Sequence, residues 1–107
     1  MRFVPTKNVG QQAMLSLHRA REGFTGDRTS TVNRIRGLMV EFGLVVPQGI
    51  GHVRSKVPAL TEDATNDLPG MFRGLIDQLL DHLNWLDQQI EAFEIQIKTW
   101  HKNNTDS

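Results

Sequence analysis

The sequence predicts an all-α fold, a long helical hairpin or coiled coil with a short helical crossover. Apolar residues recur at three- and four-residue spacings through two long stretches, and Gly and Pro residues separate those stretches. Hydrophobic residues make up only 38% of the 107 residues, and Tyr and Cys are absent, which is typical of a thin, helix-rich core. A chain of this length forms a single domain or part of one.

The first stretch predicts an extended lead over residues 1–8 and a basic helix over residues 9–43. Pro5 biases the residue before it away from helical backbone, which sets the lead apart. The apolar series of the helix is Met14, Leu17, Phe24, Thr31, Ile35, Leu38 and Phe42. Gly23 and Gly26 each cost about 1 kcal/mol relative to Ala, so we expect a bend or break near residues 23–27. Gly43 is a typical residue for the C-terminal cap.

The middle of the chain, residues 44–67, predicts a connector with one or two short helices. Pro47 prevents the first helix from continuing. One helical face carries Ile50, Val53, Val57 and Leu60. Pro58 interrupts that face, and Thr61-Glu62-Asp63 has the composition of a new helix start. The run Asn66 to Pro69 then resembles an N-terminal cap with Pro in the first turn.

Residues 68–100 predict a second long helix with the clearest pattern in the chain. Its apolar residues alternate at spacings of four and three, which is the period of a coiled-coil seam. The seam consists of Phe72, Ile76, Leu79, Leu83, Leu86, Ile90, Phe93, Ile97 and Trp100. Two interpretations are open: the seam packs against the first helix of its own chain, or it pairs with another chain. Residues 101–107 are polar, and we expect a frayed tail.

The formal net charge of zero conceals an uneven distribution of charge along the chain. Residues 1–57 contain nine basic and three acidic residues, a net charge of +6. Residues 58–107 contain three basic and nine acidic residues, a net charge of −6. Either the basic half faces a polyanion, or the two halves attract each other.

The sequence offers no complete catalytic, metal or cofactor site. Most of the acids lie at a predicted helix start or on the polar side of the seam helix, and the four histidines lack paired metal-ligand spacing. The serines and glycines form neither a nucleophile elbow nor a phosphate loop. We therefore expect a non-enzymatic protein with no cofactor and no small-molecule substrate. It also lacks a membrane span, so we expect a cytoplasmic location.

Basic side chains are the strongest candidates for a binding role. Arginine forks match phosphate oxygens, so these residues predict contact with nucleic acid. The candidates are Arg19, Arg21, Arg28, Arg34, Arg36, Arg54 and Lys56. Arg21 and Arg28 sit within the apolar stripe or at its edge, one above the other. Their alternative role is to pair with the acidic second helix.

Several motifs resemble the DEDD transposases of bridge-RNA-guided bacterial insertion sequences. They are RFVPTK at 2–7, QQ at 11–12, HRARE at 18–22, RT at 28–29, NRIRGLMVEFG at 33–43 and PQG at 47–49. Further along, LP at 68–69 and LDQQI at 86–90 resemble the central coiled-coil region of that family. The resemblance covers nearly the whole chain but only the middle of such a transposase.

The resemblance implies a transposase fragment without its own catalysis. In that family the DEDD carboxylates lie in a RuvC-like domain upstream, and an essential serine lies in a domain downstream, so no catalytic residue carries over and the metal ions would bind outside this chain. Gly23, Gly26 and Asp27 depart from the family pattern in a way that suggests decay or truncation, with Met1 an internal position turned into a start.

The implied partners are DNA or guide RNA, and a second copy or an intact transposase through the coiled coil. The alternative function is a purely structural dimerisation module that binds no nucleic acid.

Overall fold

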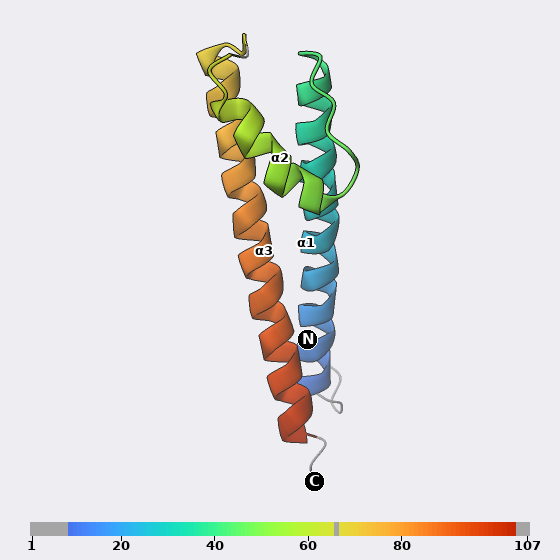
Figure 1. Ribbon diagram of the computed structural model, residues 1–107. Helices are drawn as coiled ribbons and strands as arrows, with labels where there is room; N and C mark the ends of the chain where they lie inside the picture. Colours follow the sequence, from blue (N-terminus) through green and yellow to red (C-terminus); the bar gives the residue numbers. More distant parts are fainter. Residues whose placement is uncertain (1–8, 66, 105–107) are drawn as a thin grey trace.

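A computed structural model describes residues 9–65 and 67–104, which form three α-helices and the segments that connect them, with no strand among these residues (Figure 1). They are α1 (Val9–Val40), α2 (Ile50–Glu62) and α3 (Gly70–Asn104). Helices α1 and α3 run antiparallel along the length of the molecule, and α2 crosses one face of the pair (Figure 1). The molecule is elongated, 62 × 33 × 20 Å. The predicted all-α hairpin is confirmed.

Helix α1 is continuous through its glycines, so no break occurs near residues 23–27, where a bend or break was predicted. A Cβ atom at Gly23 or Gly26 would meet nothing within 4 Å, and both positions are exposed. Packing against α3 on either side of them outweighs the weak helix propensity of two glycines. The helix ends through a Schellman motif: Leu44 donates to the Met39 carbonyl, and Gly43, at φ +79°, donates to that of Val40.

Helix α2 is one helix, although the sequence predicted an interruption at Pro58 and a new start at residues 61–63. Proline removes one backbone donor, and that loss is offset by the burial of Val53 and Val57, both 0% exposed. The helix stops before Asp63, whose backbone is extended. Arg73 of α3 then donates to the carbonyls of Thr61 and Asp63. These carbonyls at the C-terminal end of α2 thus find their hydrogen-bond donor on a neighbouring helix.

The seam of α3 packs inside its own chain. Ile76 and Leu83 are 0% exposed, and the other seven seam residues are buried or half-buried. Phe93 lies 5.4 Å from Phe24 of α1, and Phe72 lies 4.2 Å from Phe42, measured between ring centroids. The intramolecular interpretation therefore describes the seam in this chain.

The ends of α3 differ from the prediction by a few residues. The helix begins at Gly70, and the Pro69 carbonyl accepts the first backbone hydrogen bond, from Arg73. At the other end it extends to Asn104, so residues 101–104 are helical where a frayed tail was expected. The predicted extended lead over 1–8, the cap residue Asn66 and the last three residues lie outside the described part of the chain.

Candidate nucleic-acid interface

Two arginines of α1 form ion pairs with α3. Arg21 Nη2 lies 2.6 Å from Glu94 Oε2, and Arg28 Nη1 lies 3.0 Å from Asp87 Oδ1. The arginines are seven residues apart on α1, and the acids are seven residues apart on α3. Because the helices are antiparallel, equal spacings let both pairs form in one register.

A third arginine, from α2, reaches the same acid. Arg54 pairs with Oδ2 of Asp87, so this carboxylate binds guanidinium groups from two different helices. The side chain of Asp87 is 23% exposed and that of Arg28 is 33% exposed, so water screens the cluster only in part. This Asp87 cluster connects all three helices at one point.

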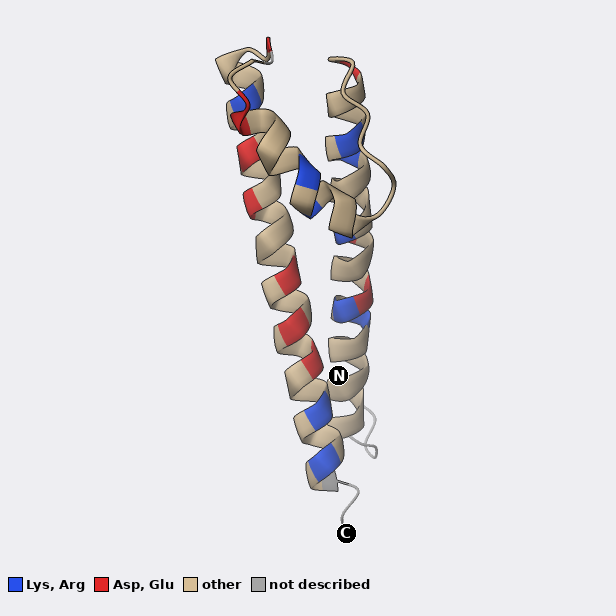
Figure 2. Cartoon of the chain, in the orientation of Figure 1, with Lys and Arg blue, Asp and Glu red and all other residues tan. Residues whose placement is uncertain are grey.

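Of the four remaining basic candidates, one makes a structural hydrogen bond and three are exposed. Arg36 Nε donates to the Val46 carbonyl over 3.0 Å and holds the connector against α1. Arg19, Arg34 and Lys56 are exposed and make no hydrogen bond or ion pair within residues 9–65 and 67–104. Figure 2 shows basic positions on α1 and α2 and a run of acidic positions along α3. Three candidates are thus available to an external phosphate without breaking an internal pair.

Part of the positive charge in the first half of the chain is therefore paired with acids in the second half. The sequence left open whether Arg21 and Arg28 face a polyanion or the acidic helix, and both pair with the acidic helix. The pairing of Arg54 with Asp87 was not foreseen. The sequence carries no signal for it, because the place where α2 crosses α3 depends on connectors whose path spacing alone does not define.

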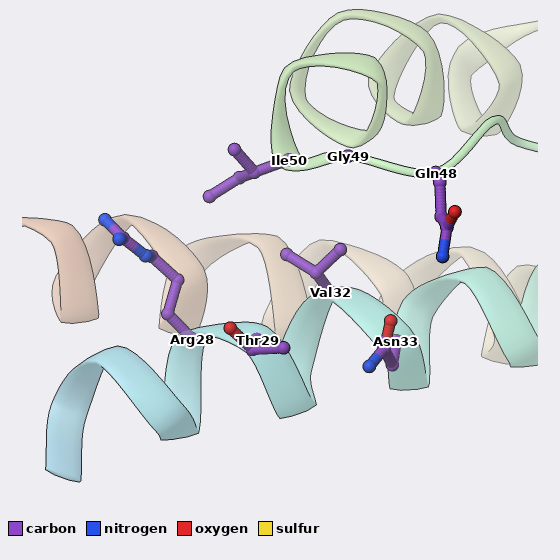
Figure 3. Close-up of a pocket in the computed structure, with 7 residues that line it drawn as sticks. All are labelled: Arg28, Thr29, Val32, Asn33, Gln48, Gly49 and Ile50. Atoms are coloured by element: carbon purple, nitrogen blue, oxygen red, sulfur yellow. The ribbon is translucent and has the colours of Figure 1, made fainter. Parts of the chain in front are cut away.

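A groove of about 520 Å³ lies between α1 and the start of α2 (Figure 3). It is lined by Arg28, Thr29, Val32, Asn33, Gln48, Gly49 and Ile50. Val32 and Ile50 supply apolar surface, and the Asn33 and Gln48 amides supply donors and acceptors on its two sides. Arg28 brings a guanidinium that Asp87 already orients.

The groove also lies at the amino end of α2. Gly49 is the N-cap residue of this helix, with φ +112°, a backbone conformation that favours glycine, so no side-chain oxygen at the N-cap accepts from the amides of the first turn. The first-turn amides of a helix carry its partial positive charge. The electrostatic character of this corner is therefore suited to an anionic group.

No described group of three His, Asp or Glu side chains is arranged to hold a metal ion. The acids of α3 instead lie along its outer side or in the ion pairs with arginine. In the part of the chain that the structure describes, no helix has the length and apolarity needed to span a bilayer.

Comparison with known proteins finds transposases. The chain is 32% identical over 98 residues to the transposase for insertion sequence element IS1328 of Yersinia enterocolitica, an alignment covering 92% of the chain and 28% of that protein. It is 34% identical over 99 residues to a probable family 20 transposase of Pseudomonas aeruginosa, covering 92% and 29%. It is 30% identical over 106 residues to the transposase for insertion sequence element IS1111A of Coxiella burnetii, covering 99% and 29%.

The chain is similar to a segment of insertion-sequence transposases. It spans less than a third of the length of the relatives it matches, so the similarity concerns one part of those proteins. No family model and no solved structure matches the chain.

Proposed function

We propose that this chain is the helical arm of an insertion-sequence transposase of the bridge-RNA-guided DEDD type, which contacts nucleic acid and associates protomers without catalysing strand transfer itself. The similarity over at least 92% of the chain to two transposases is the observation that carries the proposal. The DEDD assignment rests on the sequence motifs between residues 2 and 49 and on the seam of α3.

The hairpin architecture is suited to an arm. The first turn of α1 and the last turn of α3 lie at the same end of the molecule (Figure 1), and the rings of His18 and His101 are 6.5 Å apart there. In a longer transposase, flanking parts joined at that end would stay close together while the hairpin projects up to 62 Å away. The Asp87 cluster and the buried seam hold the helices of the arm together.

Nucleic-acid contact falls on the basic side chains that have no internal partner. Arg19 and Lys56 are exposed, and neither is held by an acid of α3. Guanidinium and ammonium groups of this kind neutralise phosphates and release condensed counterions. The groove beside Arg28 adds amide donors that hydrogen-bond sugar or base edges.

The test uses fluorescence anisotropy of labelled duplex DNA and of structured RNA over a range of salt concentrations. We expect binding that weakens steeply with salt, because counterion release gives a slope of about −0.9 per neutralised phosphate on duplex DNA. Asn33→Ala with Gln48→Ala should weaken binding at an unchanged slope, because these amides carry no charge. Absence of binding to either ligand at low salt would refute the nucleic-acid role.

A second candidate function, a purely structural dimerisation module, is favoured by one observation. Arg21, Arg28 and Arg54, three of the seven predicted nucleic-acid residues, are paired with acids of α3. On that interpretation the basic half stabilises the hairpin and needs no polyanion. Failure to bind nucleic acid, with self-association retained, would select this second function.

A further inference from the structure

The Asp87 cluster contains more positive than negative charge. Arg21 and Glu94 pair one to one, whereas the single carboxylate of Asp87 binds the guanidinium groups of both Arg28 and Arg54. No other acid of residues 9–65 and 67–104 forms an ion pair with either arginine. Two positive charges and one negative charge leave the cluster with an excess of positive charge after its own pairing.

The two guanidinium groups converge on separate oxygens of one anion. Arg28 Nη1 lies 3.0 Å from Oδ1 of Asp87, and Nη2 of Arg54 contacts Oδ2. Planar guanidinium donors match the oxygens of a phosphate as well as those of a carboxylate, so two arginines that donate to one small anion are also a typical phosphate site. The position that the Asp87 carboxylate fills thus has the donors that a phosphate group needs.

The arginines of the cluster are more accessible than the carboxylate. The side chains of Arg54 and Arg28 are 40% and 33% exposed, against 23% for Asp87, whose Oδ2 atom is buried. Arg28 also lines the groove between α1 and the start of α2, so its side chain borders open space (Figure 3). Both guanidinium groups are therefore within reach of an external oxyanion.

Asp87 opposes a phosphate at this position in two ways. Its oxygens occupy the donors that a phosphate would use, and its negative charge repels the approaching group. Because the carboxylate belongs to the same chain, its effective concentration is far higher than that of a phosphate in solution. The competition is nevertheless real, since Lys56, to which the proposed function assigns phosphate contact, follows Arg54 by two residues on α2. A nucleic acid bound at Lys56 brings phosphates close to the cluster.

We propose that Arg28 and Arg54 form a second phosphate site, for the backbone of a nucleic acid, which the Asp87 carboxylate fills from within the chain and holds closed. Asp87 thereby restrains the affinity of the chain for nucleic acid. The site exists only while α2 lies across the hairpin, because α1 and α2 each supply one arginine. The inference rests on the proposed function and adds to it an intramolecular restraint on binding.

The salt dependence of duplex-DNA binding, measured by fluorescence anisotropy, tests this restraint. Asp87→Asn should steepen the slope by about two units, one for each arginine that gains a phosphate contact, and should tighten binding at low salt by at least about tenfold. The matched control is Glu91→Gln, which removes one negative charge a turn further along α3. Glu91 is exposed and forms no ion pair with a described residue, so its substitution should leave the slope unchanged.

Substitution of Arg54 in two backgrounds assigns the effect to this site. In the Asp87→Asn background, Arg54→Gln should remove about one unit of the added slope. In the wild-type background it should leave the slope unchanged, because Asp87 already occupies this arginine. A general effect of positive charge would flatten the slope equally in both backgrounds, so the difference between them isolates the coupling of Arg54 to Asp87. Circular dichroism reports whether each variant keeps its helices.

If the wild type binds DNA and Asp87→Asn has the same slope as Glu91→Gln, the inference is overturned and the proposed function stands. If Asp87→Asn does not fold, Arg54→Gln in the wild-type background still decides. An unchanged slope there supports the restraint, and a slope flattened by about one unit would show that Arg54 already contacts phosphate and would overturn it. Absence of DNA and RNA binding by the wild type at low salt instead refutes the proposed nucleic-acid role.

Discussion

Arg28 Nη1 lies 3.0 Å from Oδ1 of Asp87, and Oδ2 of the same carboxylate pairs with Arg54. One acid of α3 therefore fixes both α1 and α2. Without this cluster, α2 would be held against the hairpin chiefly by Val53, Val57 and the contacts of Arg73 with its C-terminal end. The cluster explains why an arginine at the edge of an apolar stripe is compatible with a stable helix pair.

We expect Asp87→Asn to lower the free energy of unfolding by about 1–2 kcal/mol, since it leaves two guanidinium groups without their carboxylate in a partly screened site. Thermal unfolding followed by circular dichroism measures this loss. A double-mutant cycle with Arg28→Gln separates the pair from its surroundings. Additive effects of the two substitutions would show that the pair contributes nothing to stability.

Leu83→Asp should abolish the hairpin fold. Leu83 is 0% exposed and lies in the core cluster, and an unpaired buried carboxylate costs several kcal/mol, comparable to the total stability of a small domain. Ile90→Asp should act in the same direction. Helicity at 222 nm should fall at every protein concentration, because the seam packs within the chain. Ile95→Asp, at an exposed position, is the control and should keep the helicity.

Asp63 should titrate below the usual range of an aspartate. The Thr65 hydroxyl and then the Thr65 amide donate to its carboxylate and lower its pKa, and the charge of Arg73 acts in the same direction. The turn therefore gains stability above the pKa of the unfolded chain and loses it as pH falls through the lowered pKa. An NMR titration of the Thr65 amide measures this, with Asp63→Asn as the control. Thr65→Ala should raise the midpoint, and an unchanged midpoint would contradict the assignment.

Incubation of the purified chain with Mg²⁺ or Mn²⁺ and labelled DNA should give neither cleavage nor strand transfer. Phosphodiester chemistry of this kind needs carboxylates that converge on metal ions, and no described cluster of three such ligands exists. Reproducible cleavage that disappears when one of the chain's own acids is substituted would contradict this expectation. Cleavage that survives every such substitution would indicate a contaminating nuclease.

The sequence predicted the hairpin well because its strongest signal is periodicity. The seam from Phe72 to Trp100 defined α3, and Gly43 marked the end of the first helix. Local propensity was less reliable. Gly23, Gly26 and Pro58 suggested breaks that tertiary packing overrides, because burial of neighbouring apolar side chains exceeds the cost of a few weak helix formers.

The candidate site was predictable only in part. Sequence singled out the basic residues and offered pairing of Arg21 and Arg28 with the acidic helix as one of two roles, because both lie at the edge of the apolar stripe. It missed the role of Arg54 and the capping of α2 by Arg73, which depend on where α2 crosses the hairpin. The groove at Gln48 was missed for the same reason, because it exists only where the connector returns to α1.

The central claim is that the basic residues divide into a structural set and a nucleic-acid-binding set, and two charge-matched double variants test it most directly. Each removes two positive charges: Arg19→Gln with Lys56→Gln, and Arg21→Gln with Arg28→Gln. Thermal stability and the salt dependence of nucleic-acid binding are measured for both.

We predict that the first variant flattens the salt slope by about two units, one per lost phosphate contact, with an unchanged unfolding temperature. The second should lower the unfolding temperature and leave the slope nearly unchanged, because its arginines are held by Glu94 and Asp87. The reverse assignment, with the slope lost in the second variant and kept in the first, would contradict the account.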